Sequence, residues 1–241
     1  MTPLVELRGV TKTFGGVAAN VDISFDVHEG EILGLIGPNG AGKTSLFNSI
    51  SGEVSPDSGT ITLAGQRISG QGPLACARAG VARTFQVVRS FDSMTVLENV
   101  MVGAFSRTSR PAEAMRVAQD VLAFAGLDRR ADAAAHELTP PEKRRLEVAR
   151  ALATKPRLLL LDEMLTGLTP TEAAAGVALV RAVRDQGVTV IMVEHVMEVV
   201  LPLVDRAVVL NLGRVLMQGS PAEVVRNPDV IRAYLGDKYA A

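Results

Sequence analysis

A glycine-rich segment, Gly37–Thr44, has the residue types and spacing of a phosphate-binding loop. It reads Gly-Pro-Asn-Gly-Ala-Gly-Lys-Thr and matches the pattern G-x-x-x-x-G-K-[ST]. Glycines let the backbone bend so that consecutive N–H groups point at phosphate oxygens. The Lys43 ammonium can reach the outer phosphates, and the Thr44 hydroxyl is placed to bind Mg²⁺. The segment therefore predicts a nucleotide site between a strand and a helix, whose N-terminus adds partial positive charge.

A second chemical element lies at Leu158–Glu163, where four leucines precede Asp162 and Glu163. A continuously apolar run is typical of a buried parallel strand, and ligands of open α/β sheets bind at the carboxyl ends of the strands. Asp162 would hold Mg²⁺, and Glu163 would activate the attacking water as a general base. An acidic pair often simply ends a strand at solvent, so this interpretation depends on the phosphate loop.

Three further residues lie where they could complete the site. Phe14 is expected in a Gly-rich loop before the phosphate loop, Gln86 follows a short apolar segment, and His195 follows a buried apolar run. Each has an ordinary alternative: Phe14 could be a core residue, Gln86 a surface glutamine, and His195 a helix cap. Only their combination with the two elements above favours a functional interpretation.

Composition limits the class of protein. The chain has 241 residues with 25 Lys+Arg and 26 Asp+Glu, so it fits one domain with an insertion and lacks the strongly basic character of a nucleic-acid binder. One cysteine, Cys76, excludes an intramolecular disulfide and a Cys-rich zinc site and suggests a reducing compartment. No apolar run approaches the length of a membrane span, and the first twenty residues do not resemble a signal peptide. We therefore expect a cytoplasmic protein that reaches a membrane only through a partner or its surface.

The elements that must position these residues follow from periodicity. Val21–His28 alternates apolar and polar residues as a half-buried strand does. Residues 90–155 are rich in Ala and Arg with helical spacing, and they predict a helical insertion. The remaining predicted strands are Glu31–Ile36, Ile61–Leu63, Leu158–Leu161, Val188–Val193, Ala207–Leu210 and Val215–Met217. The predicted helices are Lys43–Ser51, Thr171–Asp185 and Pro221–Arg226, and Ser55–Gly59 is a predicted turn. The βαβ alternation predicts an α/β fold with a parallel sheet covered by helices.

The chain resembles the ATP-binding subunit of ABC transporters over nearly its whole length. The resemblance is carried by the order of Phe14, Gly37–Thr44, Gln86, Asp162-Glu163 and His195. Four segments are similar to the branched-chain amino-acid uptake branch: Arg83–Gln86, Met94–Val100, Arg144–Arg150 and Asn227–Gly236. The resemblance implies a P-loop NTPase fold of the ABC ATPase type, with a RecA-like core and an antiparallel β subdomain. It places this core and β subdomain at about residues 1–88 and 156–241, and an inserted helical signature subdomain at about 89–155.

The resemblance also implies residue roles. Phe14 would stack on adenine, Gln86 would contact the metal and relay the nucleotide state, and His195 would contact the γ-phosphate. The segment from Gln86 to about Val100 would face the coupling helix of the membrane subunit. Lys43, Glu163 and His195 form the predicted catalytic set, and Thr44, Gln86 and Asp162 the predicted metal set. ATP would contact Phe14, Gly37, Pro38, Asn39, Gly40, Ala41, Gly42, Lys43, Thr44, Ser45 and Gln86.

One segment departs from the family pattern. Where members carry Leu-Ser-Gly-Gly-Gln, this chain has Leu138-Thr-Pro-Pro-Glu142. In the family this segment acts in trans on the ATP of the other subunit, and Pro140 and Pro141 have no N–H to donate. Thr139 and Glu142 still form a capping box with proline at the first helical position. Nearby, Gly167-Leu168-Thr169 stands where Gly-Leu-Asp or Gly-Leu-Asn is usual.

Two explanations of these departures stay open. In an asymmetric heterodimer, the ATP held by this chain would be hydrolysed with a normal signature segment from a different partner, while the partner's ATP would face Pro140 and Pro141. In the alternative, the loop has drifted and still works through Thr139 and the helix N-terminus, in a homodimer or a heterodimer.

The predicted function is an ATP-hydrolysing importer subunit for branched-chain or related amino acids, with two permease subunits, a second ATPase and an extracytoplasmic binding protein as partners. Urea, short amides and aromatic compounds are alternative substrates. A non-catalytic nucleotide-binding regulator is the alternative of another class, against which the intact Glu163 and His195 argue. Repair and translation ATPases of the same type would carry insertions or a second cassette, and a P-loop kinase would not need Gln86 and His195.

Overall fold

The structure is a computed structural model that describes residues 3–86, 88–194 and 197–235. Its N-terminal part is an antiparallel sheet in the order β2-β1-β4-β5, which the predicted β subdomain anticipated. The strands are β1 (Pro3–Phe14), β2 (Val17–His28), β4 (Ser58–Leu63) and β5 (Gln66–Arg67). In β2 the apolar residues Ile23, Phe25 and Val27 are buried while Ser24 is exposed, as the alternation predicted.

A second, six-stranded sheet positions the predicted site and has the order β10-β9-β3-β8-β7-β6. Its strands are β3 (Ile32–Ile36), β6 (Val81–Arg83), β7 (Leu158–Asp162), β8 (Thr189–Val193), β9 (Arg206–Asn211) and β10 (Arg214–Gly219). All neighbours are parallel except β10, which pairs antiparallel with β9. The predicted parallel sheet is therefore correct for five strands, and the hairpin at one edge makes the sheet mixed.

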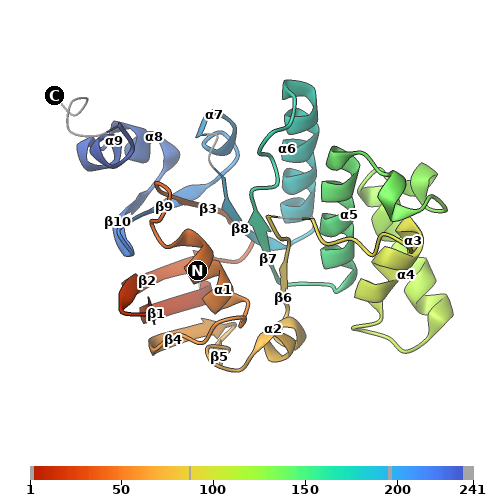
Figure 1. The fold of residues 1–241 in the computed structure, drawn as a ribbon, viewed down its shortest axis with the longest axis horizontal. Helices are drawn as coiled ribbons and strands as arrows, with labels where there is room; N and C mark the ends of the chain where they lie inside the picture. The colour runs from red at the N-terminus through yellow and green to blue at the C-terminus, as the bar shows by residue number, and fades with distance from the viewer. Residues whose placement is uncertain (1–2, 87, 195–196, 236–241) are drawn as a thin grey trace.

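Nine α-helices lie in the described part of the chain, and Figure 1 shows their arrangement. They are α1 (Lys43–Ile50), α2 (Pro73–Ala79), α3 (Val96–Ala104), α4 (Pro111–Phe124), α5 (Pro140–Ala153), α6 (Pro170–Asp185), α7 (Met197–Val200), α8 (Pro221–Arg226) and α9 (Pro228–Leu235). Short 3₁₀ turns cover Asp128–Arg130 and Ala135–Glu137.

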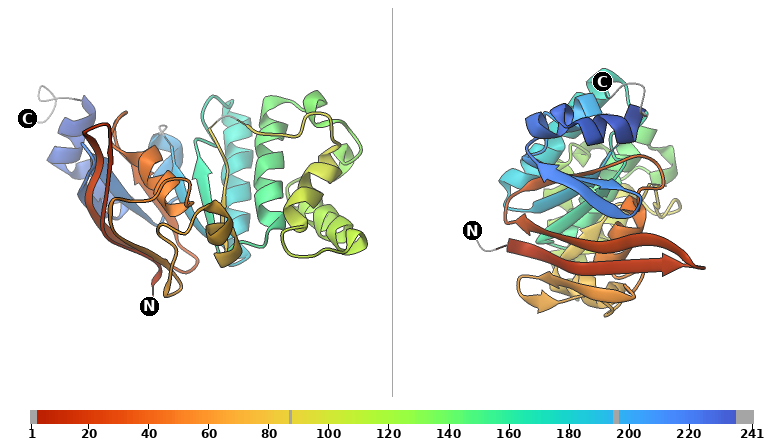
Figure 2. Two further views of the ribbon diagram at one scale, coloured as in Figure 1. Left: turned by 60° about the horizontal axis from the view of Figure 1, so that its bottom comes forward. Right: turned by 90° about the vertical axis from the view of Figure 1, so that its left-hand side faces the viewer.

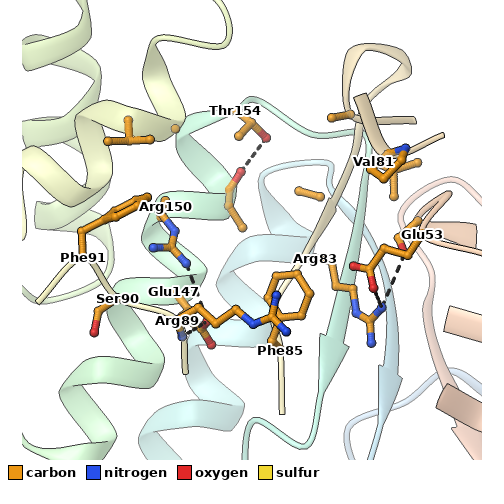
Figure 3. A pocket seen from close by; sticks show the side chains of 17 residues that line it. Glu53, Val81, Arg83, Phe85, Arg89, Ser90, Phe91, Glu147, Arg150 and Thr154 are labelled. Atoms are coloured by element: carbon orange, nitrogen blue, oxygen red, sulfur yellow. Dashed lines mark hydrogen bonds and ion pairs between the residues drawn. The ribbon is translucent and has the colours of Figure 1, made fainter. Parts of the chain in front are cut away.

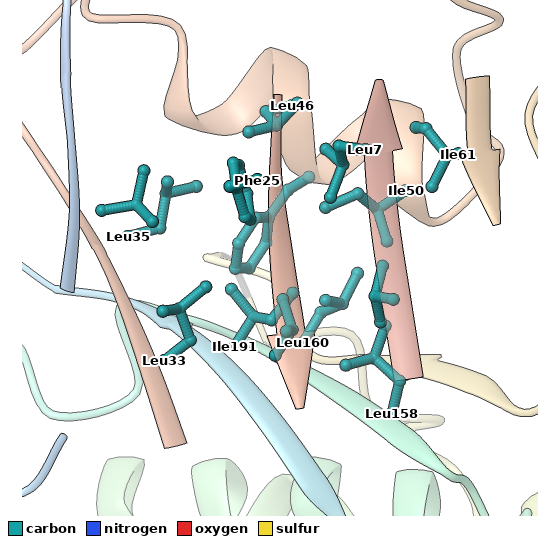
Figure 4. Packing of buried hydrophobic residues seen from close by; sticks show 14 of the residues in the cluster. Leu7, Phe25, Leu33, Leu35, Leu46, Ile50, Ile61, Leu158, Leu160 and Ile191 are labelled. Atoms are coloured by element: carbon teal, nitrogen blue, oxygen red, sulfur yellow. The ribbon is translucent and has the colours of Figure 1, made fainter. Parts of the chain in front are cut away.

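Two hydrophobic clusters cover the two faces of the six-stranded sheet. Successive side chains of a strand point to opposite faces, so Leu158 and Leu160 of β7 pack toward the antiparallel sheet and α1, whereas Leu159 and Leu161 pack on the side of α6. Figure 4 shows the first cluster, in which β1 and β2 contribute Leu7 and Phe25. A run of four leucines is needed because β7 is buried on both faces.

The helical insertion has an apolar cluster of its own, formed by buried residues of α3, α4 and α5. Leu122 of α4 and Leu146 of α5 belong to it, whereas Val148 and Ala151 of α5 belong to the cluster beneath the six-stranded sheet. One helix thus connects the insertion to the sheet. Figure 2 shows the insertion at the opposite end of the molecule from α8 and α9.

Several local expectations are corrected by the structure. Phe14 is not in a loop: it ends β1 and pairs with Val17, because Gly15 and Gly16 both have positive φ and close a tight hairpin. The expected turn Ser55–Gly59 is too long, because β4 already begins at Ser58 and pairs with Thr11. Helices α2, α7 and α9 had not been expected. In the described residues, no helix combines the length and the apolar character needed to cross a bilayer.

Candidate active site

The phosphate loop connects the carboxyl end of β3 to the first turn of α1, as its pattern predicted. Gly37 has φ +150°, and a Cβ there would lie 2.2 Å from the Leu210 carbonyl oxygen. Gly42 has φ +98°, and a Cβ there would lie 2.2 Å from the Ala19 carbonyl oxygen. Both positions therefore require glycine, for its backbone freedom and for close packing against neighbouring strands.

The Lys43 side chain is buried and lies along the loop. Its Nζ donates hydrogen bonds to the Gly37 carbonyl at 2.6 Å and the Pro38 carbonyl at 2.9 Å. Burial lowers the pKa of Lys43, while the charges of Glu163 and Asp162 oppose that shift. The ammonium is therefore within electrostatic reach of Glu163 and Asp162, the two carboxylates predicted for the same site.

Asp162 ends β7 with its side chain buried. Its backbone N–H donates to the Thr84 hydroxyl at 3.2 Å, and its Oδ2 accepts from Arg83 Nη2 at 2.9 Å. The Arg83 contact had not been expected. Sequence analysis had used Arg83 only as part of a family-like segment, since nothing in the spacing indicates which carboxylate an arginine 79 residues away will meet.

Glu163 follows β7 with φ +51°, an uncommon backbone conformation for a residue with a side chain. Its backbone N–H donates to the Val193 carbonyl at 2.9 Å, and its Oε2 accepts from Gln86 Nε2 at 3.0 Å. Such conformations concentrate at functional sites. The structure thus brings Gln86 and Glu163 together, two residues that the sequence had proposed for one site.

The oxygen donors of the predicted metal set are suited to magnesium. Mg²⁺ is usually bound through one or two carboxylates together with substrate phosphates and water. Thr44, Gln86 and Asp162 offer a hydroxyl, an amide oxygen and one carboxylate, which is such a hard donor set. Within the described residues, no three His, Cys, Asp or Glu side chains gather as a metal cluster. The residues present therefore fit a magnesium ion that is completed by nucleotide phosphates.

Phe14 and His195 are the two remaining predicted nucleotide contacts. Phe14 is 46% exposed, with Lys12 Nζ 5.4 Å from its ring centroid. An exposed ring at a hairpin tip offers a face for stacking. The hairpin lies near the phosphate loop, because Ala19 of β2, the strand that pairs with Phe14, packs its backbone against Gly42. His195 lies outside the described residues.

The Thr139–Glu142 segment starts α5 with the predicted capping box. The Thr139 backbone N–H and its hydroxyl both donate to Glu142 Oε2, each at 2.8 Å. The hydrogen bond from the Thr139 backbone N–H, helped by the one from its hydroxyl, holds the Glu142 pKa below its usual range. The prolines at the first two helical positions offer no N–H, and the only hydroxyl of the segment is already engaged. Thr169 and Glu172 form the second predicted capping box at the start of α6.

Two residues near the site had not been singled out from the sequence. Glu194 is buried and accepts the backbone N–H of Leu165 and, at 2.9 Å, the hydroxyl of Thr166. Burial raises its pKa. The side chain of Tyr234 on α9 is 36% exposed overall, yet burial of its phenol raises its pKa to about 12, against a hydrogen bond from the Gly37 backbone. The sequence signal for Glu194 is weak, because one acidic residue at a strand end has many explanations.

A groove of about 540 Å³ adjoins the segment that leads to Gln86. Figure 3 shows its basic and aromatic lining, in which the Arg89 guanidinium lies 4.4 Å from the Phe85 ring centroid and Arg150 lies 5.4 Å from that of Phe91. Glu147 of α5 is buried at its base and accepts the Arg89 backbone N–H at 2.9 Å. The groove therefore joins the insertion to the segment around Gln86.

Comparisons with known proteins show the family of this chain. Residues 21–166 match the ABC transporter family model, and residues 214–240 match the model described as branched-chain amino acid ATP-binding cassette transporter. The chain is 40% identical to the high-affinity branched-chain amino acid transport ATP-binding protein BraF of Pseudomonas aeruginosa and 41% identical to LivG of Salmonella typhimurium. Each of these alignments covers 98% of both proteins.

Solved structures of ATP-binding cassettes have the same fold. A nucleotide-free ATP-binding cassette from an ABC transporter superposes with a TM-score of 0.89 at 27% identity, and the ADP conformation of MJ1267 with a TM-score of 0.88 at 27% identity. Each alignment covers 98% of this chain and all of the other. The predicted P-loop NTPase fold of the ABC ATPase type is thereby confirmed. This chain belongs to the ABC transporter ATP-binding proteins, in the branched-chain amino acid transport family.

Proposed function

We propose that this chain energises an importer of branched-chain or related amino acids by hydrolysing ATP at the site formed by the phosphate loop, Gln86, Asp162 and Glu163. ABC transporter ATP-binding proteins hydrolyse ATP to drive transport, and this chain is one of those ATPases. The observation that supports the residue assignment best is the 3.0 Å contact between Gln86 Nε2 and Glu163 Oε2. It joins the predicted metal set to the predicted general base.

In the proposed chemistry, the N–H groups of Gly37–Thr44 and the Lys43 ammonium bind the phosphates, and Phe14 stacks on adenine. Thr44, Gln86 and Asp162 hold Mg²⁺, which neutralises phosphate charge when it is bound. Glu163 takes a proton from water as that water attacks the γ-phosphorus, and the γ-phosphate leaves ADP as inorganic phosphate. His195 is proposed to contact the γ-phosphate. Pro38, Asn39, Gly40, Ala41, Gly42 and Ser45 complete the proposed nucleotide contacts.

For the assembly, we propose an asymmetric ATPase dimer with a different partner subunit. The groups that act on this chain's own ATP are present, whereas Pro140 and Pro141 withhold two backbone donors from the partner's ATP. The Thr139 hydroxyl is also held by Glu142 at 2.8 Å. The partner's ATP would therefore turn over slowly, and the ATP held by this chain would turn over at the normal rate.

A segment replacement tests this proposal. Thr139-Pro-Pro-Glu142 is exchanged for Ser-Gly-Gly-Gln, which keeps the S-x-x-Q form of a capping box while it restores backbone donors. The native chain alone should release phosphate at a rate close to zero, whereas the variant should release it at a clearly measurable rate. Similar rates in both chains would mean that the native segment is competent. ATP binding without phosphate release in either chain would support a nucleotide-binding regulator instead.

For the partners, we propose that the groove beside Gln86 receives a coupling segment of a permease subunit, which places the chain at the inner face of the cell membrane. Its exposed apolar and aromatic lining and its arginines suit a short amphipathic segment with acidic groups. A binding protein outside the membrane would deliver the solute. The proposed amino-acid substrate is supported by relatives whose names specify branched-chain amino acid transport.

The substrate is tested with the co-purified permease and binding protein. The binding protein is titrated calorimetrically with leucine, urea, a short amide and an aromatic acid. Leucine should bind with the highest affinity. Stimulation of phosphate release should follow the same order. Binding of urea, amide or aromatic compound in place of leucine would contradict the proposed substrate and leave the ATPase assignment intact.

A further inference from the structure

Arg83 ends β6 and contacts the carboxylate proposed to hold Mg²⁺. Its Nη2 lies 2.9 Å from Asp162 Oδ2, and the two side chains are only 7% and 5% exposed. Removing one partner of a buried ion pair leaves an uncompensated charge, so such a contact constrains both groups strongly. Asp162 is therefore oriented by a fixed guanidinium rather than by solvent.

The same guanidinium is anchored to the helix that follows the phosphate loop. Arg83 Nη1 donates to Asn48 Oδ1 of α1 and to Ser51 Oγ at 3.5 Å. Its guanidinium carbon lies 5.7 Å from the ring centroid of Phe47 and 5.2 Å from that of Phe85. These contacts hold the guanidinium in place against α1. The group that contacts Asp162 is therefore positioned by the helix that follows the phosphate loop.

Arg83 also lines the groove. Figure 3 shows it near Glu53, whose Oε2 lies 3.5 Å from Arg83 Nη1. The Glu53 side chain is 37% exposed, so solvent screens that pair, whereas the pair with Asp162 is buried and shorter. Of the two carboxylates, Asp162 is consequently the one held more firmly.

We propose that Arg83 is a positioning residue that holds Asp162 in the orientation needed to bind Mg²⁺ with ATP. A carboxylate has two oxygens and about four acceptor sites, so one guanidinium contact leaves capacity for a metal. Magnesium demands near-ideal octahedral geometry, which makes the orientation of its carboxylate important. The inference rests on the proposed function, because it takes Asp162 as a ligand of Mg²⁺.

The test measures binding of a fluorescent, non-hydrolysable ATP analogue to the full chain at increasing Mg²⁺ concentration. In Arg83→Met, the half-saturating Mg²⁺ concentration should rise about 10–100-fold, which is the usual effect of losing a group that orients a metal ligand. Binding of the analogue in EDTA should be unchanged. The control Arg157→Met removes a 2.7 Å pair with the exposed Glu29 at the opposite end of β7 and should leave the Mg²⁺ response unchanged.

Two further variants make the outcomes distinguishable. If circular dichroism shows that Arg83→Met does not fold, the test uses Arg83→Lys instead. This variant keeps the charge but loses the planar fork, so it should raise the half-saturating Mg²⁺ concentration by less than Arg83→Met would. A requirement that is unchanged or lower in the folded Arg83 variants overturns the inference. If Asp162→Asn leaves the Mg²⁺ response intact, the proposed metal role of Asp162 fails; if only Asp162→Asn changes the response, the role of Arg83 fails alone.

Discussion

Gln86 Nε2 donates to Glu163 Oε2 across 3.0 Å and joins two segments that are 77 residues apart in the chain. Gln86 lies just beyond β6 and Glu163 just beyond β7, and these neighbouring strands run parallel. Their carboxyl ends therefore meet at the same edge of the sheet. A movement of the segment around Gln86, which adjoins the groove, would directly change the surroundings of the proposed general base.

The role of Glu163 is tested by Glu163→Gln, which keeps the size of the side chain and removes its basicity. Phosphate release should fall about 10²–10⁴-fold, the usual contribution of a general base, while ATP binding is retained and the closed dimer accumulates. Glu172→Gln changes a capping carboxylate on α6 and serves as the control. Unchanged phosphate release in Glu163→Gln would remove Glu163 from the proposed role.

The phosphate loop should not tolerate alanine at Gly42. Gly42→Ala places a Cβ 2.2 Å from the Ala19 carbonyl oxygen, so the loop must shift and ATP binding should be lost. Gly187→Ala is the matched control: its φ is also positive, at +85°, but nothing lies within 4 Å of the added Cβ. It should cost only the backbone strain, about 1–2 kcal/mol. Equal ATP affinity in both variants, measured by equilibrium binding, would contradict the packing argument.

Glu194 should make stability depend on pH. Burial raises its pKa above the ordinary value of 4.5, so the folded state binds the proton more tightly than the unfolded state does. This contribution is complete below that ordinary value and is lost as pH rises through the raised folded value. Glu194→Gln should therefore flatten the pH profile of the free energy of unfolding from pH 4 upward.

The same measurement separates charge from hydrogen bonding at Glu194. Glutamine can still accept the Leu165 N–H, whereas Glu194→Ala leaves that donor unsatisfied and should cost about 1–3 kcal/mol in urea unfolding at pH 7. If Glu194→Gln keeps the wild-type pH dependence, the titrating group is elsewhere in the chain.

Tyr234 should ionise at a higher pH than an ordinary tyrosine. Its pKa of about 12 means that the folded protein favours the neutral phenol, so its contribution to stability is lost as pH rises from about 10 to about 12. Absorbance at 295 nm should show a step near pH 12 that Tyr234→Phe deletes. Tyr239→Phe, outside the described residues, is the control and should keep that step. A full titration near the ordinary tyrosine value in wild type would show that the phenol is solvated.

The proposed permease surface is tested on α3. Val102 lines the groove and is 39% exposed, so Val102→Glu should place a charge in the contact and abolish co-purification with the permease subunits. Val225 on α8 is 48% exposed and lies outside the groove, and Val225→Glu is the matched control. Loss of the complex in both variants, or in neither, would place the permease contact elsewhere.

The sequence by itself determined the elements whose signals are local. Gly37–Thr44 and the leucine run before Asp162 each encode their own backbone geometry, through glycine conformations and through burial on both faces of a strand. The capping boxes at Thr139 and Thr169 were predictable for the same reason, because the residues that bond are three positions apart. These local patterns, read in chain order, sufficed for the fold class and the family.

Tertiary structure alone decided which distant side chains meet. Arg83 reaches Asp162, and Gln86 reaches Glu163, because the order of the strands places β6 beside β7. No spacing rule anticipates such partners, since the contact depends on which strands become neighbours rather than on the residues between them. The extended position of Phe14 was missed for a related reason: its strand is defined by pairing with β2 across the hairpin.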